Sequence, residues 1–264
     1  MVDTTVVRAQ NRNSMANPTA ASLLVALICW PSVVGGADDL RRATVWDLKI
    51  GQPVAAQPAP EEFRGLACGS NGGPPRRRLV GWSDYMDCRP EASGLREIYF
   101  EYDDEYEYVA RARDLPREIA RWSGTSEAGF PVIVSALFDE TGMLAAIRIV
   151  TDPRPDHRNE VADADVRKRA DAHLFGQLMA ARFDIDSATQ CRAQPAAEGE
   201  SAIGSIFVKQ SCEATDSGRG RKVILAANFF RKRGQSGTNP QLPTQLTQGQ
   251  FESSARVEIH RLDP

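Results

Sequence analysis

The stretch from Leu95 to Ala112 gathers the residues of this chain whose types could do chemistry. It holds four of the five tyrosines and the densest run of carboxylates in the sequence. Ile98 and Phe100 alternate with charged or polar neighbours, which predicts a strand, and the acidic residues after Tyr102 predict a turn. We therefore predict a β-hairpin with an acidic and aromatic tip. Its candidate binding residues are Tyr99, Tyr106, Tyr108, Asp103, Asp104, Glu105 and Glu107.

Tyrosines at alternate strand positions favour contact with another macromolecule. A tyrosine ring buries apolar area while its hydroxyl keeps a polar partner, and such rings are enriched at protein interfaces. We therefore expect a non-enzymatic binding protein that contacts a protein or an envelope component through this hairpin.

The carboxylates permit two alternatives. A second acidic stretch, Asp152 to Asp165, could serve a small periplasmic hydrolase or a metal-dependent enzyme, and either stretch could make a calcium-dependent binding module. Calcium needs about six to eight oxygen ligands from a suitably curved loop, and neither stretch has the EF-hand spacing. We predict no bound metal and no cofactor.

The usual catalytic signatures are missing from the sequence. It contains no G-x-S-x-G, H-E-x-x-H or S-x-x-K motif and no phosphate-binding loop. The three histidines are His157, His173 and His260, and His173 falls beside the apolar stripe of an expected helix, which favours a packed structural role. We assign no catalytic residue.

The N-terminal 37 residues have the order of a secretory signal peptide. Arg8 and Arg12 precede the apolar run Ser22 to Trp30, and small residues follow up to Ala37. The apolar run is far shorter than the roughly 20 residues that span a bilayer. The translation start is either Met1 or Met15. We expect a periplasmic or secreted protein.

Cleavage after Ala37 would leave 34 acidic and 30 basic residues. This mild excess of negative charge gives no general attraction for nucleic acid or an anionic membrane. It would also leave four cysteines, and an even number in an exported chain favours disulfides. Three pairings are open, and the similar separations favour Cys68 with Cys88 and Cys191 with Cys212. A zinc site is disfavoured because no C-x-x-C motif occurs.

The remaining patterns predict an α+β fold, with antiparallel hairpins in a sheet covered by one long and one short helix. Phe130 to Val150 predicts a hairpin around Asp139 to Gly142. The other expected elements are a short helix over Leu115–Trp122, a long helix over 159–183 whose buried stripe includes Leu174 and Leu178 with Phe175 and Met179 offset, and strands over Ile203–Ser211, Val223–Phe230 and Phe251–Leu262.

The chain then divides into an N-terminal arm with a cysteine-stapled loop (38–94) and a body (95–264). The two hairpins share an aromatic residue, an acidic turn and a terminal proline, so two halves, 38–128 and 129–264, are an alternative division. The basic run Arg76 to Arg78 is expected at a solvated loop tip.

The segment L-K-I-G-Q-P-V, with Gly51 and Val54, followed by an acidic hairpin, resembles the small periplasmic lipoproteins of outer-membrane assembly. The resemblance covers about Leu48 to Val109. The chain departs from that pattern because it lacks a lipid-modified cysteine and carries the cysteine loop. We therefore transfer no function from it.

Overall fold

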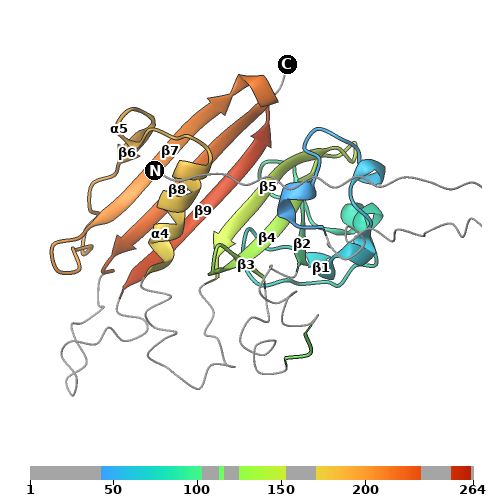
Figure 1. Ribbon diagram of the computed structural model, residues 1–264, viewed down its shortest axis with the longest axis horizontal. Coiled ribbons are helices and arrows are strands. Elements are labelled where there is room, and N and C mark those ends of the chain that lie inside the picture. Colours follow the sequence, from blue (N-terminus) through green and yellow to red (C-terminus); the bar gives the residue numbers. More distant parts are fainter. Residues whose placement is uncertain (1–42, 103–112, 116–124, 153–170, 233–250, 263–264) are drawn as a thin grey trace, which may run out of the picture. The chain divides into compact units, whose positions relative to one another are not determined.

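A computed structural model describes residues 43–102, 113–115, 125–152, 171–232 and 251–262 of the chain. All of them belong to one compact unit, Arg41–Pro264. They form a mostly β fold, with nine antiparallel strands in the order β1-β2-β4-β5-β9-β8-β7-β6 and β3 paired to β4 (Figure 1). The strands are β1 (Arg64–Cys68), β2 (Arg96–Glu101), β3 (Ser126–Glu127), β4 (Phe130–Phe138), β5 (Leu144–Thr151), β6 (Cys191–Ala193), β7 (Val208–Asp216), β8 (Arg221–Phe230) and β9 (Glu252–Arg261).

The helical elements are short. Among the described residues the α-helices are α4 (Leu174–Arg182) and α5 (Ser187–Gln190), and a 3-10 turn over Asp171–His173 leads into α4. Further 3-10 turns cover Val45–Asp47, Val54–Ala56, Pro60–Glu62, Trp82–Asp87 and Ser217–Arg219. Within the described ranges, no helix has both the length and the apolar composition needed to cross a bilayer.

The hairpin predicted for Phe130 to Val150 is confirmed as β4 and β5. Gly142 closes it with a φ of 80°, a conformation that glycine adopts without strain. The Asp139 carboxylate accepts hydrogen bonds from the backbone N–H groups of Thr141 (2.9 Å) and Met143 (3.0 Å). The acidic residue therefore caps the turn rather than facing a ligand.

The hairpin predicted for Leu95 to Ala112 is wrong along β2. One edge of β2 pairs with β1 and the other pairs with β4, so no edge is left for a returning strand beside Ile98 to Phe100. Pairing with β1 was missed because R-G-L-A-C is short and Gly65 interrupts its alternation. Residues 103–112 lie outside the described residues.

The last three predicted strands are present, and one of them is displaced along the chain. The bounds of β8 and β9 lie within two residues of the prediction, whereas β7 covers Val208–Asp216 rather than Ile203–Ser211. β9 does not end the sheet, because it lies between β5 and β8 (Figure 1). The C-terminal strand therefore joins the two parts of the sheet.

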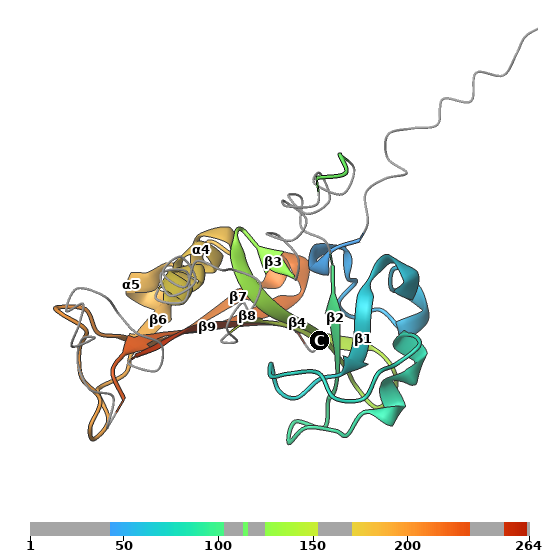
Figure 2. The ribbon, with the colours of Figure 1, turned by 90° about the horizontal axis from the view of Figure 1, so that it is seen from below.

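The helix α4 covers one face of β8 and β9, with its buried side rotated from the prediction (Figure 2). Phe175, Gly176 and Met179 are buried, while Leu174 and Leu178 are 37% and 39% exposed. A Cβ on Gly176 would stand 2.8 Å from the Cβ of Ala227, so this glycine allows the helix its close approach. The predicted residues 159–170 of this helix, and residues 116–124 of the predicted short helix, lie outside the described residues.

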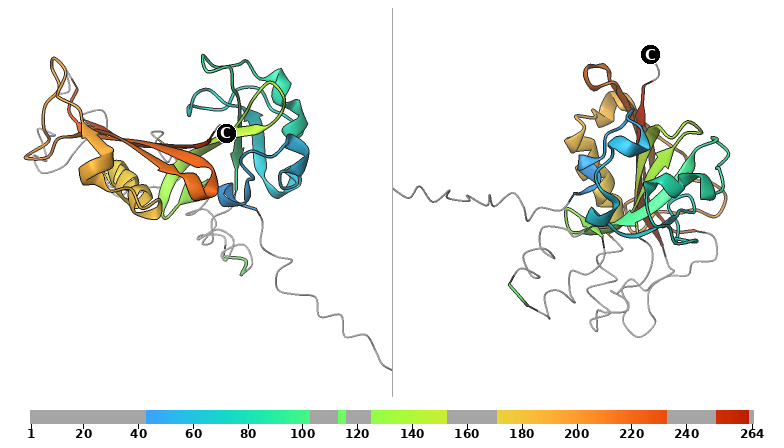
Figure 3. Two further views of the ribbon diagram at one scale, coloured as in Figure 1. Left: turned by 90° about the horizontal axis from the view of Figure 1, so that it is seen from above. Right: turned by 90° about the vertical axis from the view of Figure 1, so that its right-hand side faces the viewer.

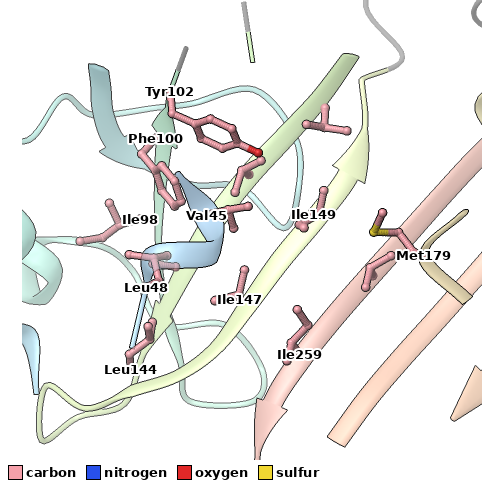
Figure 4. Close-up of a cluster of buried hydrophobic side chains, with 14 of the residues drawn as sticks. Val45, Leu48, Ile98, Phe100, Tyr102, Leu144, Ile147, Ile149, Met179 and Ile259 are labelled. Carbon is pink, nitrogen blue, oxygen red and sulfur yellow. The ribbon is translucent and has the colours of Figure 1, made fainter. Parts of the chain in front are cut away.

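The same face of the sheet is covered further along by the N-terminal arm. Val45 and Leu48 pack in one core cluster with residues of β2, β5 and β9 and with Met179 of α4 (Figure 4). Figure 3 shows the first turns of the arm and α4 on the same side of β5 and β9. The Gln57 side chain organises the arm by donating to the carbonyls of Lys49 and Gln52.

Both predicted disulfides are present. Cys68 is bonded to Cys88, and Cys191 to Cys212, with sequence separations of 20 and 21. The first staples the loop that follows β1, and the second joins β6 to β7. Two structural disulfides are typical of a protein that folds outside the reducing cytoplasm.

Candidate functional site

The sheet has a second face, turned away from α4, which we call the polar face. Strand alternation places Glu97 of β2, Arg148 of β5, and Arg256 and Glu258 of β9 on it. Register sets Arg148 directly opposite Glu258. Here the structure brings together charged residues that lie far apart in the sequence.

Arg148 is the centre of this cluster, and its side chain is 4% exposed. It holds Glu91 with two hydrogen bonds (2.6 and 2.9 Å), donates to Glu258 through Nε (2.7 Å) and lies 3.2 Å from Glu97. Burial alone would lower the pKa of Arg148, but the hydrogen bonds to Glu91 and Glu258 raise it instead. The guanidinium therefore stays charged.

Two of the carboxylates around Arg148, those of Glu91 and Glu258, are held in their ionised forms. The hydrogen bond from Arg148 lowers the pKa of Glu91. Burial would raise the pKa of Glu258, but hydrogen bonds with His260 (3.0 Å) and Arg148 bring it far below its ordinary value. Groups that stay ionised at neutral pH make poor general acids. The cluster is suited to holding structure together.

The cysteine-stapled loop folds over this cluster. The backbone N–H groups of Asn71 and Gly72 donate to the Glu97 carboxylate, the second at 3.0 Å, and Glu97 is 3% exposed. Arg256 donates to Asn71 from the sheet. A Cβ on Gly69 would lie 2.4 Å from the Glu97 side chain, so only glycine fits there. The loop thus closes the cluster on one half of the polar face.

We expected Tyr99 to be a binding residue, but it contributes to this covered half. Its ring is 4% exposed, in a small cluster with Ala67 and Ile133, and its hydroxyl donates to Glu101 at 2.5 Å. Its side chain offers little surface to a partner. The other expected binding residues, Asp103, Asp104, Glu105, Tyr106, Glu107 and Tyr108, lie outside the described residues.

The two ends of the connection that carries those residues are fixed to each other. Tyr102 donates its backbone N–H to Thr125 Oγ1 (3.3 Å) and its hydroxyl to Glu127 (3.1 Å). Trp46 of the N-terminal arm also donates to Glu127, at 3.0 Å. Tyr102 is 2% exposed. The chain therefore leaves the sheet at Tyr102 and returns to the same place at Thr125.

Two further long connections leave from the same end of the sheet. β2, β5 and β8 run in one direction, so Tyr102, Asp152 and Lys232 all lie where those strands end (Figure 1). We call this the loop end, and the opposite end, with the turns at Gly142 and Gly220, the turn end. Asp152 donates its backbone N–H to Pro131 (2.9 Å), and the rest of the predicted second acidic stretch lies outside the described residues.

The chain matches no protein-family model, no curated protein and no solved structure. The resemblance to outer-membrane-assembly lipoproteins therefore carries no argument about function.

Two of the three histidines, His173 and His260, lie within the described residues. His173 is 7% exposed, stacks on Phe229 at 4.3 Å between ring centroids, and has Nδ1 3.3 Å from Ser253 Oγ. His157 lies outside the described residues, and His260 belongs to the cluster around Glu258. Within the described ranges, no group of three or more histidine, cysteine, aspartate or glutamate side chains is placed to hold a metal ion.

The basic run Arg76 to Arg78 lies along the edge of β1. Backbone hydrogen bonds join Cys68 to Arg77 and Leu79 to Leu66, so this segment extends the sheet by a short irregular pairing. Arg77 forms an exposed ion pair with Asp87 at 2.9 Å. Charged side chains on an edge discourage pairing with other chains, which gives this run a structural role.

Proposed function

We propose that this is an exported, non-enzymatic binding protein of the periplasm that contacts a protein or envelope component through the acidic and aromatic segment 103–112. The observation that carries the proposal is the closed base of the connection 103–124, which contains that segment: Tyr102 bonds to both Thr125 and Glu127 at the loop end. Fixing the two ends of a connection to a sheet reduces the number of conformations open to it, which lowers the entropy lost when it binds a partner.

The covered half of the polar face supports the proposal indirectly. Its most buried charges, Arg148 and Glu97, are paired with neighbours of the same chain, so their contacts account for them as structural residues. Unlike those residues, the carboxylates and tyrosines of 103–112 follow a strand whose edges are both taken. The sheet does not require them beside β2, which favours a role in contact.

Crosslinking in the native envelope tests the proposal. The wild type is compared with a Tyr106→Ala/Tyr108→Ala variant, and crosslinked partners are identified by mass spectrometry. We expect at least one partner to be lost with the two tyrosines. The matched control is Val80→Ala/Met86→Ala, which removes apolar surface from residues that are 93% and 52% exposed elsewhere on the molecule.

Metal analysis of the purified mature protein separates the alternatives. A stoichiometric cation lost on Asp103→Asn/Asp104→Asn would replace the proposal by a calcium-dependent binding module. A cation lost only on Asp156→Asn would instead point to an enzyme built on the Asp152 to Asp165 stretch.

A further inference from the structure

The loop over the polar face contains an Asn-Gly pair, Asn71–Gly72. Both residues have positive φ, 62° and 75°. In any Asn-Gly pair the glycine nitrogen can attack the side-chain amide of the asparagine, because no side chain on the glycine stands in the way. The pair is thus the part of this loop with the greatest capacity for covalent change.

Two charged residues hold the atoms of that reaction. The Gly72 N–H, on the attacking nitrogen, donates to Glu97 Oε1 at 3.0 Å. The Asn71 side-chain oxygen, on the carbon that would be attacked, accepts from Arg256 Nη2 at 2.6 Å, and Arg256 Nη1 donates to the Asn71 carbonyl at 3.1 Å. Arginine only donates, so its partner atom is the amide oxygen.

We propose that Asn71–Gly72 is a deamidation site that Glu97 and Arg256 keep unreactive while the loop is closed. In the reaction the Gly72 nitrogen loses its proton and bonds to Asn71 Cγ, and ammonia leaves from the side chain. Water then opens the resulting succinimide to aspartate or isoaspartate. No oxidant or reductant is needed.

Glu97 blocks the first step in two ways. Its negative charge disfavours loss of the Gly72 proton, and its hydrogen bond directs the nitrogen toward the sheet. Arg256 fixes the side chain that must rotate toward that nitrogen. The reaction therefore requires local opening of the loop, which makes its rate a measure of how often the cover on the Arg148 cluster opens.

The isoaspartate product would not restore the closed loop. It adds a carbon to the main chain beside Gly72, which is packed so closely that a Cβ on Gly72 would stand 2.6 Å from the Val150 side chain. An aspartate at position 71 would keep a carboxylate oxygen opposite Arg256, so we expect that product to close the loop again. The isoaspartate product would therefore record an opening event permanently.

The test compares native wild-type protein with the same chain in urea, with its disulfides intact, at mildly alkaline pH. Peptide mass spectrometry follows aspartate and isoaspartate at position 71, and Asn228, which precedes Phe229, is the internal control. We expect the native rate to be about tenfold or more below the unfolded rate, because two sets of bonds to charged groups must break first. Equal rates would overturn the proposal.

Glu97→Gln removes the charge but keeps the shape of the side chain. If the variant stays folded by circular dichroism, its Asn71 should react faster than the native wild type, and an unchanged rate would overturn the role of Glu97. If it does not fold, Arg256→Gln decides the matter, since it removes both hydrogen bonds to Asn71 and leaves Arg148 with Glu258. A raised rate supports the proposal, and an unchanged rate contradicts it.

Discussion

The two halves of the polar face carry ion pairs of the same length in different surroundings. Arg148 lies 2.7 Å from Glu258 on the covered half, and Lys222 lies 2.7 Å from Glu213 on the other. The Arg148 side chain is 4% exposed, whereas Lys222 and Glu213 are 33% and 61% exposed. Strand alternation is the same in both places, and the difference is the stapled loop that covers only one of them.

The contribution of a charged residue on a sheet face to stability therefore depends on whether another segment covers it. A buried pair loses hydration and must be fully bonded, so breaking it is costly, while an exposed pair contributes little. The covered charges are thus part of the fold, and contact with a partner is better sought at the loop end.

Replacing the central arginine should have the largest effect. Arg148→Met leaves Glu91, Glu97 and Glu258 without their shared partner, which should cost about 3–5 kcal/mol of unfolding free energy. Lys222→Met, the matched change on the other half, should cost less than about 1 kcal/mol. Urea denaturation of both variants measures the difference. Equal losses would show that the covering loop does not determine how much each ion pair contributes to the unfolding free energy.

Removing each disulfide in turn compares how much the stapled loop and the β6–β7 link contribute to stability. The closed loops have nearly equal lengths, so chain entropy predicts about 3 kcal/mol for each. Cys68→Ala/Cys88→Ala should cost more than this, because it also loosens the loop over Glu97, whereas Cys191→Ala/Cys212→Ala should stay near it. Denaturant midpoints of the two double variants give the ranking, and the reverse ranking would contradict the covering role of the loop.

A smaller loss of stability is expected from a change on the opposite face of the sheet, under α4. Gly176→Ala would place a Cβ 2.8 Å from that of Ala227, so the helix must shift away from β8. We expect a loss of about 1–3 kcal/mol, as for overpacked cores. Gln177→Ala, at the exposed neighbouring position, is the control and should not destabilise the protein. Thermal unfolding followed by circular dichroism measures both.

Acid should weaken the covered half selectively. The folded-state pKa values of Glu91 and Glu258 lie below the ordinary 4.5, so the unfolded chain takes up protons first as the pH falls. The cluster therefore contributes its full stability above about pH 5 and loses it progressively below. Urea midpoints at about pH 7 and about pH 3.5 should differ less in Glu258→Gln than in the wild type. An unchanged difference would mean that other carboxylates dominate.

Local patterns predicted the parts of the fold that depend on neighbouring residues. Alternation and Gly142 identify the β4–β5 hairpin, and the cysteine separations identify both disulfides. The prediction of a hairpin partner for β2 was wrong because β2 pairs with β1, a short strand whose alternation Gly65 interrupts. The prediction of the buried side of α4 was wrong because the close approach of Gly176 to Ala227 sets that side, and these two residues are far apart in the sequence.

One residue in the sequence indicates the buried charge cluster around Arg148. Arg148 lies in the apolar strand L-A-A-I-R-I-V, and a charge among such neighbours requires a buried partner. Which partner could not be predicted, because Glu91 and Glu258 are 57 and 110 positions away. Glu258 reaches Arg148 through the register of β5 and β9, and Glu91 reaches it from the loop before β2. The candidate binding residues of 103–112 stay a prediction from residue types and spacing.

The most direct test of the account is the yield of crosslinked partner in the native envelope for two variants that should both fold. Tyr106→Ala/Tyr108→Ala changes the segment that follows Tyr102, and Lys222→Met changes the half of the polar face that the stapled loop leaves open. The account predicts loss of the partner with the tyrosines and an unchanged yield with Lys222→Met. Retention of the partner without the tyrosines, or its loss in Lys222→Met, would contradict it.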